Sequence, residues 1–198
     1  MTETQLVKPD FAYLPGYQNA LQRGWSPDNT RAEVASEHLA LIEQDAAGFL
    51  AELDDPEARG APFRAPDGTL LPRLPGFIRW IWDGEFCGSI GFRWQNGTSE
   101  LPPTVLGHIG YSVVPWKQRQ GHATRALQQL LPMARQRGLE HVVLTTDPDN
   151  LVSQRVILAC GGQLLGRFRK SEVYGGKEGL RYRIELAGSQ NDPPASRL

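Results

Sequence analysis

The chain has 198 residues, a formal net charge of −1 and 40% hydrophobic residues, which is enough apolar material for a sizeable core. It has no apolar run near the ~20 residues that cross a bilayer, and its basic residues are scattered along a nearly neutral chain. We therefore expect neither a membrane protein nor a nucleic-acid-binding protein. Because the N-terminus lacks a basic and then apolar leader, the expected location is cytoplasmic. Cys87 and Cys160 form no disulfide framework or metal cluster, and we expect two reduced, partly buried thiols and no metal.

The charge is unevenly distributed along the chain. Residues 1–100 contain 15 acidic and 8 basic side chains, whereas residues 101–198 contain 13 basic and 7 acidic ones. This distribution favours an anionic ligand near the second half and mildly favours a cationic one near the first. A merely solvated surface would explain the same asymmetry.

The first half of the chain predicts mostly helices. A short strand is expected at 6–7 and a short helix over 13–22, ended by Gly24. After a turn at 26–29, apolar residues at helical spacing predict an amphipathic helix over 34–53. Residues 60–76 contain four prolines and are expected to form a loop.

The second half alternates strands and helices. Strands are predicted at 77–82 and 86–94 around an Asp83-Gly84 turn, and at 105–114, closed by Pro115. A helix over 121–137 contains Pro132, which is expected to kink it. The remaining elements are a strand at 142–146, a helix at 151–160 and strands at 164–169 and 180–186. This order predicts an α/β (α+β) fold with a mixed, mostly antiparallel sheet of six to seven strands and helices on both faces.

The segment from Ser112 to Leu131 is the most informative part of the chain. It predicts an apolar strand, a proline stop, a loop rich in N–H donors, and a helix that opens at Gly121. The first N–H groups of a helix have no internal partner and lie at the positive end of its dipole. Gly121 has no side chain, so a ligand oxygen can approach the backbone closely. The loop is therefore a predicted seat for a phosphate or diphosphate.

The order of elements, together with this loop, resembles the GNAT superfamily of N-acetyltransferases. Its signature is Gln/Arg-x-x-Gly-x-Gly/Ala between the fourth strand and the third helix, and Gln118, Gly121 and Ala123 fill those positions. Asn150 and Ser153, with a later glycine, resemble the second acetyl-CoA motif of the family. The stretches GHIGYSVVP, DPDN and RYRI resemble an uncharacterised bacterial subgroup, which identifies no substrate.

The resemblance implies a single acetyltransferase domain over residues 1–187, whose fourth and fifth strands splay apart. The tail 188–198 is polar and contains prolines, so we expect it to be disordered. Acetyl-CoA is the implied co-substrate. Backbone groups near Tyr111 and Val113 would hold its pantetheine arm, and Asn150 would contact the same region. The diphosphate would be held by Gln118, Arg119, Gln120, Gly121, His122, Ala123 and Thr124.

The catalytic residues are less well defined. Many relatives use a glutamate of the fourth strand as general base, but residues 105–114 contain none, and His108 is the strong titratable base there. A hydrogen bond within the sheet is the alternative role for His108, and Glu85 and Glu100 are further candidate bases. Relatives often protonate the leaving thiolate with a tyrosine seven residues after the second motif, where this chain has Ile157.

Tyr111 is the predicted substitute for that tyrosine, with Tyr174, Tyr182 or water as alternatives. Cys160 is expected to be structural. The resemblance further implies a small-molecule or peptide amine as the acceptor, which the acidic first half suggests is cationic, and Trp25 and Trp116 are candidate pocket residues. Exposed strand edges are compatible with a homodimer. A non-catalytic acyl-CoA sensor and a plain interaction module are the competing functions.

Overall fold

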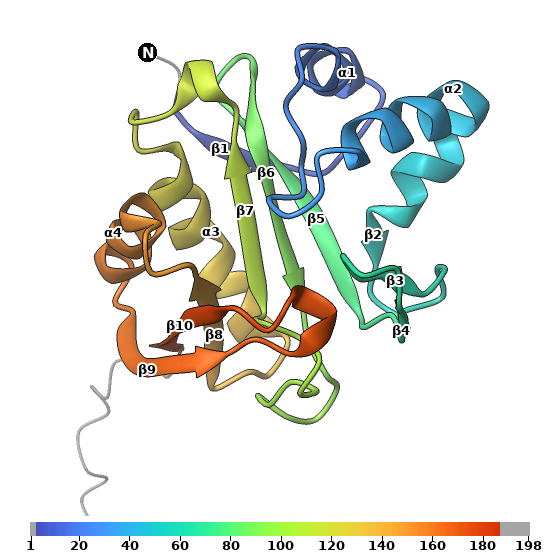
Figure 1. Cartoon of the computed structure of the whole chain (residues 1–198). Coiled ribbons are helices and arrows are strands. Elements are labelled where there is room, and N and C mark those ends of the chain that lie inside the picture. Colours follow the sequence, from blue (N-terminus) through green and yellow to red (C-terminus); the bar gives the residue numbers. More distant parts are fainter. Residues whose placement is uncertain (1–2, 187–198) are drawn as a thin grey trace, which may run out of the picture.

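The computed structural model describes residues 3–186 and contains two main antiparallel sheets, flanked by four α-helices, and a small two-stranded sheet (Figure 1). Helices α1 and α2 lie on one side, and α3 and α4 on the other. No helix in the described residues is both long and apolar enough to cross a membrane. The predicted α+β class, with helices on both faces, is confirmed.

The larger sheet has the strand order β1-β5-β6-β7, and β2 also pairs with β5. Its central pair is an antiparallel hairpin that turns at Asp83 and Gly84, as the sequence predicts. Trp80 of β5 stacks on Tyr17 of α1, with 4.7 Å between the ring centroids. The bounds are β1 Gln5–Val7, β2 Asp54–Asp55, β5 Gly76–Trp82, β6 Phe86–Arg93 and β7 Ile109–Val113.

The smaller sheet has the order β8-β10-β9, and all its pairs are antiparallel. The bounds are β8 His141–Thr146, β9 Gln163–Arg169 and β10 Glu178–Glu185. Helices α3 and α4 cover one face of both sheets, and their apolar residues form one core cluster with β6, β8 and β10. Burying these side chains is the main driving force for joining the two sheets.

Four α-helices and two short 3-10 helices complete the described fold. Helix α2 changes direction at Asp45, whose backbone is not helical and whose carboxylate accepts a hydrogen bond from the Gly48 N–H. Helix α3 continues through Pro132. The bounds are α1 Leu14–Gln22, α2 Val34–Glu52, α3 His122–Gln136, α4 Leu151–Ala159, η1 Pro115–Lys117 and η2 Glu172–Tyr174.

Three details differ from the predictions. The expected single mixed sheet is two sheets, and every strand pair in residues 3–186 is antiparallel. The strand expected at 105–114 begins only at Ile109, and the preceding His108 bonds through its carbonyl to Arg93 of β6 and through its N–H to Val143 of β8. The loop at 60–76 contains a small hairpin of β3 Phe63–Arg64 and β4 Leu70–Leu71. The predicted disordered tail at 188–198 lies outside the described residues.

Candidate active site

The loop between β7 and α3 has an unusual backbone. Arg119 has a φ of 59°, which is rare for a residue with a side chain, and Gly121 has a φ of 81°. These two left-handed residues turn the chain so that α3 begins at His122. Left-handed turns of this kind often direct several N–H groups to one side and bind anions.

Six successive N–H groups in this loop and helix start are available to a ligand. Within the described residues, the N–H groups of residues 119–124 donate to no main-chain carbonyl. The amides of Gln118 and Gln120 instead turn back onto the loop, where they donate to the carbonyls of Val113 (3.2 Å) and Trp116 (3.4 Å). A Cβ on Gly121 would lie 2.6 Å from an Arg125 nitrogen, so the Arg125 guanidinium lies beside this position.

A second feature is the gap between β7 and β8, which belong to different sheets. The two strands meet at one end, where the His108 N–H donates to the Val143 carbonyl at 2.8 Å. His108 and Val114 both form main-chain hydrogen bonds with β6. Because hydrogen-bonded pairs alternate along an antiparallel strand, the even-numbered residues of β7 bond to β6 and the odd-numbered ones do not. The main-chain groups of Tyr111 and Val113 therefore face the gap.

Tyr111 and α4 meet across this gap. The Tyr111 hydroxyl lies 3.0 Å from the Ser153 Oγ, and the Ser153 N–H donates to the Asn150 side chain at 3.0 Å. The structure thus brings the predicted residues Tyr111 and Asn150 together through Ser153. Burial raises the pKa of Tyr111 to about 12, so the phenol remains protonated at neutral pH.

The environment of His108 favours a structural role. Its side chain is fully buried, and its Nδ1 accepts a hydrogen bond from the Val143 N–H at 2.9 Å. Burial, assisted by the positive charges of His141 and Arg93, lowers the pKa of His108 to about 4. With Nδ1 occupied, the neutral ring carries its proton on Nε2 and has no lone pair to offer a substrate.

The other predicted residues are spread over several surfaces. Glu85 lies 3.1 Å from the Lys117 ammonium at the β5–β6 turn, and Glu100 lies 3.8 Å from His141, so neither faces the middle of β7. Ile157 is buried in the core below α4. The Cys160 thiol donates to the Thr124 carbonyl and joins α4 to α3.

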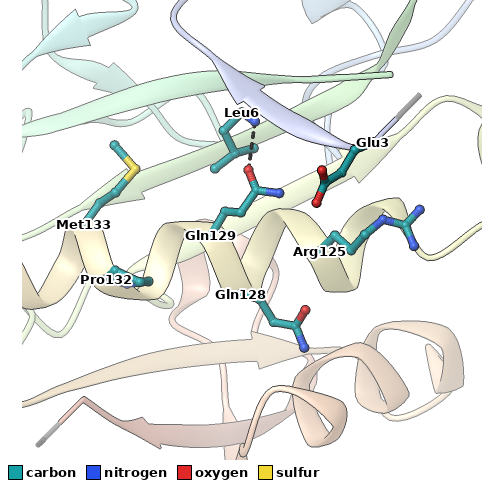
Figure 2. A pocket seen from close by; sticks show the side chains of 7 residues that line it. All are labelled: Glu3, Leu6, Arg125, Gln128, Gln129, Pro132 and Met133. Atoms are coloured by element: carbon teal, nitrogen blue, oxygen red, sulfur yellow. Dashed lines mark hydrogen bonds between the residues drawn. The ribbon is translucent and has the colours of Figure 1, made fainter. Parts of the chain in front are cut away.

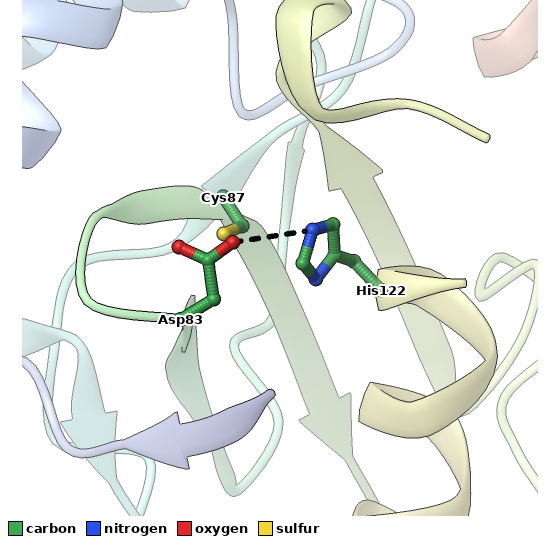
Figure 3. A group of neighbouring side chains, drawn as sticks. All are labelled: Asp83, Cys87 and His122. Carbon is green, nitrogen blue, oxygen red and sulfur yellow. Dashed lines mark ion pairs between the residues drawn. The ribbon is translucent and has the colours of Figure 1, made fainter. Parts of the chain in front are cut away.

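A buried polar cluster fastens the loop to the β5–β6 turn. Asp83 accepts hydrogen bonds from the Lys117 ammonium at 3.1 Å and lies 3.5 Å from His122 (Figure 3). The ligand-type atoms of Asp83, Cys87 and His122 lie within 4.8 Å of one another, which is compatible with a metal ion. Lys117 already neutralises the carboxylate, and burial as well as Asp83 raises the pKa of Cys87 to about 12, so the arrangement suits a structural cluster.

Two cavities lie beside α3. One, of about 740 Å³, lies between the helix and β1 and contains none of the predicted contact residues (Figure 2). The other, of about 440 Å³, lies next to the loop between β7 and α3 (residues 114–121, the anion loop). It is lined by Asp83, Gly84, Glu85, Lys117, Gln120, His122 and Arg125. Arg125 provides positive charge beside the unpaired N–H groups of the loop, whereas Lys117 is paired with Asp83 and Glu85.

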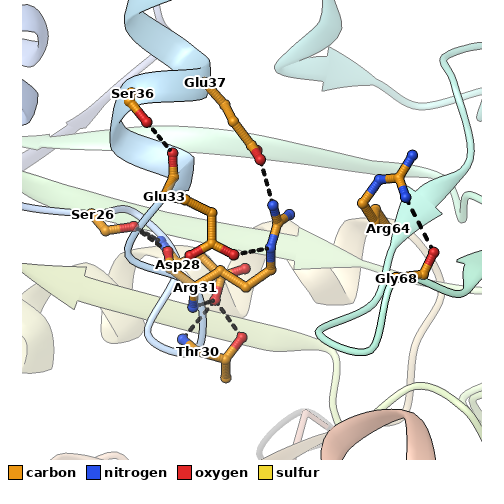
Figure 4. Close-up of polar contacts among 9 residues, drawn as sticks. All are labelled: Ser26, Asp28, Thr30, Arg31, Glu33, Ser36, Glu37, Arg64 and Gly68. Atoms are coloured by element: carbon orange, nitrogen blue, oxygen red, sulfur yellow. Dashed lines mark hydrogen bonds and ion pairs between the residues drawn. The ribbon is translucent and has the colours of Figure 1, made fainter.

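The loop between α1 and α2 covers the face of β7 that points away from α3 and α4. The Trp25 indole donates to the Ser112 hydroxyl at 3.0 Å, and the Asn29 amide donates to the Tyr111 carbonyl at 3.1 Å. Within the loop, the Asp28 carboxylate accepts bonds from Thr30 and Arg31 (Figure 4). Trp25, a candidate pocket residue, thus contacts β7, whereas the guanidinium of Arg23 lies 3.4 Å from the ring centroid of Trp116.

Sequence reasoning missed three residues in this region. Asp83 was interpreted only as a turn residue, although Asp83 and Lys117 form the main fastening of the loop. Asn29 lies in a turn that gave no indication of its contact with β7. Arg93 did carry a detectable signal, because it is the only charged residue of an otherwise apolar strand.

Comparisons with known proteins agree with this geometry. The acetyltransferase (GNAT) family matches residues 17–161. Among solved structures, MccE, a microcin self-immunity acetyltransferase in complex with acetyl-CoA and AMP, has 19% identity, a TM-score of 0.60 and 92% coverage of both chains. RimL, a ribosomal α-N-protein acetyltransferase in complex with coenzyme A, has 18% identity, a TM-score of 0.56 and coverage of 93% and 95%.

A third solved structure is yncA from Salmonella typhimurium, a putative acetyltransferase with acetyl-CoA. It has 18% identity and a TM-score of 0.51, and the match covers 98% of this chain and 99% of that one. At these identities the three structures establish the shared fold. Among curated proteins, no sequence matches the chain.

Proposed function

Because the chain belongs to the acetyltransferase (GNAT) family, we propose that it is an acetyl-CoA-dependent N-acetyltransferase that acetylates a primary amine by direct attack on the thioester. The observation that carries this proposal is the row of unpaired N–H groups at residues 119–124, which follows an edge of β7 that pairs with no further strand in the described residues. A helix start of this kind suits a diphosphate, and an open strand edge suits a chain with amide groups.

The residues present fit acetyl-CoA. The N–H groups from Arg119 to Thr124 would bind the diphosphate, and the Arg125 guanidinium beside Gly121 would add positive charge. The N–H groups of Tyr111 and Val113 would bind the pantetheine arm, because their carbonyls already accept hydrogen bonds from Asn29 and Gln118. Asn150 lies at the far side of the gap. When bound, acetyl-CoA supplies an activated acetyl group.

Tyr111 is the proposed general acid. Its hydroxyl is protonated at neutral pH and reaches Ser153 of α4, four residues before Ile157. The Tyr111 Oη would deliver its proton to the departing sulfur. Water is the proposed acceptor of the amine proton. His108 is fully buried and its Nδ1 already accepts a hydrogen bond, which disfavours its predicted role as general base.

Calorimetric titration with acetyl-CoA tests the binding site. Gly121→Glu should weaken binding roughly 100-fold or more, since a side chain and a negative charge would occupy the diphosphate seat. Gly138→Glu is the matched control, because Gly138 has a similar φ of 85° at the other end of α3 and has open space around it. Equal affinity of both variants for acetyl-CoA, or no binding by the unmodified protein, would overturn the proposal.

A non-catalytic acyl-CoA sensor is the second candidate function. The observation that favours it is Ile157, an apolar core residue at the position where relatives carry a tyrosine. Thiol release from acetyl-CoA across a broad panel of amines separates the two functions. Sustained amine-dependent release supports the enzyme, and tight binding without release supports the sensor. A cytoplasmic location, a single domain and a homodimer stay predictions.

A further inference from the structure

Arg93 has an unusual position at the end of β6. Phe92 and Trp94 on either side of it lie in the core below the sheet, so the Arg93 side chain extends from the opposite face. There it crosses toward β7, where a Cβ on Gly110 would be 3.7 Å from its Nη2. Since Gly110 has no side chain, the guanidinium lies over the bare backbone of β7.

The Arg93 guanidinium has no counter-ion. Among residues 3–186, it forms no ion pair, and its side chain makes no hydrogen bond to another residue. Burial lowers its pKa, and the Asp28 carboxylate of the α1–α2 loop partly counteracts this without forming an ion pair with Arg93. Its other titratable neighbour is His108, which is neutral at physiological pH. A partly buried cation without a partner costs free energy that a bound anion would recover.

The α1–α2 loop, η2 and β7 surround this guanidinium. The α1–α2 loop lies over β7 through the bond from Asn29 to the Tyr111 carbonyl, and the Ser112 hydroxyl contacts the same loop at Ser26. On the other side, η2 brings Tyr174 near Arg93, and its phenol is neutral at physiological pH because burial raises its pKa. In Figure 1 the loop before α2 and the turn containing η2 both lie over the β6–β7 part of the sheet. Arg93 therefore lies beside the stretch of β7 that faces the gap.

We propose that Arg93 binds an anionic group, a carboxylate or a phosphate, on the acceptor amine. This inference rests on the proposed N-acetyltransferase function and names its substrate class: amines that carry an anionic group near the nitrogen. The planar guanidinium offers parallel N–H donors that match both kinds of anion. The acidic first half of the chain suggested a cationic acceptor, and Arg93 changes this expectation at the point where the acceptor would meet β7.

Steady-state kinetics with matched amines test the proposal. Amino acids are compared with their amides, and aminoalkyl phosphates with the corresponding aminoalcohols, so that each pair differs in one anionic group. The unmodified enzyme should prefer the anionic member of at least one pair by roughly 10- to 100-fold in kcat/KM. The pair that shows the preference distinguishes a carboxylate from a phosphate ligand.

Arg93→Gln should abolish this preference through a higher KM for the acceptor, while the KM for acetyl-CoA stays unchanged. Arg79→Gln is the control, because Arg79 lies on the neighbouring strand and is already paired with Asp54. If Arg93→Gln fails to fold, Arg93→Lys keeps the charge without the planar fork and should reduce the preference. An unmodified enzyme without any preference, or a preference that survives Arg93→Gln, would overturn the proposal.

A wrong N-acetyltransferase proposal would give a different experimental result from a wrong proposal for Arg93. A protein that binds acetyl-CoA but acetylates none of the amines removes the N-acetyltransferase proposal. Calorimetric titration of the acetyl-CoA-loaded protein with the same matched amines then decides the role of Arg93. Tighter binding of the anionic members that is lost in Arg93→Gln supports an anion site, and equal binding of both members rejects it.

Discussion

Tyr111 connects the two sides of the gap through a single hydroxyl. If this group protonates the leaving sulfur, Tyr111→Phe should lower kcat by about 100-fold and leave the KM for acetyl-CoA nearly unchanged. Because the pKa of Tyr111 is raised to about 12, the unmodified enzyme should show no loss of activity from its ionisation below about pH 10. Stopped-flow and steady-state thiol release over a pH series measure both effects.

Ser153→Ala is the matched control for this prediction. It removes the hydrogen-bond partner of the Tyr111 hydroxyl but keeps the phenol itself. We expect a loss of about 1 kcal/mol in the free energy of unfolding for either variant, and a large loss of kcat for Tyr111→Phe alone. If both variants lose the same amount of kcat, Tyr111 only positions α4 and another group is the acid.

The anion loop as an element depends on its fastening to the β5–β6 turn. Burial alone would raise the pKa of Asp83, but hydrogen bonds, chiefly from Lys117, outweigh burial and lower it. The carboxylate therefore stabilises the fold at neutral pH, and this contribution is lost as the pH falls through the lowered pKa. Asp83→Asn should weaken acetyl-CoA binding by about tenfold and flatten the acid limb of the stability curve, measured by calorimetry and urea unfolding.

Glu85→Gln provides the comparison. Its carboxylate also lies 3.1 Å from the Lys117 ammonium, but the Glu85 side chain is 77% exposed, so solvent screens the pair. This variant should change neither acetyl-CoA affinity nor acid stability measurably. Equal effects of the two variants would mean that charge near Lys117, and not the buried bond to Asp83, controls the loop.

The sequence predicted this loop well and its fastening poorly. Gly121 and the helix after it follow from local preferences, since a left-handed glycine before a helix start depends on neighbouring residues only. The bond between Asp83 and Lys117 joins positions 34 residues apart, and no local pattern encodes it. The same holds for Arg93, whose unpaired state becomes apparent only when β7 and the α1–α2 loop are placed around it.

In the whole molecule, His108 lies where the two sheets meet. Its lowered pKa of about 4 means that the folded protein keeps it neutral, whereas the unfolded chain protonates it near pH 6.5. Between these values the unfolded state binds more protons, so stability is complete above about pH 6.5 and falls as the pH drops toward 4. The loss attributable to His108 should be about 3 kcal/mol, measurable by urea unfolding over a pH series.

His108→Asn tests this assignment, since the asparagine can still accept the hydrogen bond from Val143 but does not titrate. The variant should be less stable at pH 8, because it packs less well, but its stability should depend less on pH between 6.5 and 4. An unchanged slope in that interval would assign the acid sensitivity to other groups. A collapse of thiol release at all pH values, with unfolding unaffected, would instead support the catalytic role predicted for His108.

The same junction shows why the sheet could not be predicted in full. The apolar run at 105–114 favours one continuous strand, and nothing local indicates that it begins only at Ile109. What ends the ladder is a long-range contact between His108 and Val143, made when β8 arrives from another part of the chain. The types of the long elements were therefore predicted correctly, whereas the short strands β2, β3 and β4 and the division into two sheets were not.

The exposed main-chain edge of β7 has a consequence for how this protein can change its substrates. A ligand that lies along that edge is recognised through peptide groups, which every residue supplies regardless of its side chain. Gly110 and Ser112 point away from that edge and toward the α1–α2 loop, so they can be exchanged with little effect on recognition of the shared donor. Within this single five-residue strand, the choice of acceptor can therefore change while recognition of acetyl-CoA is kept.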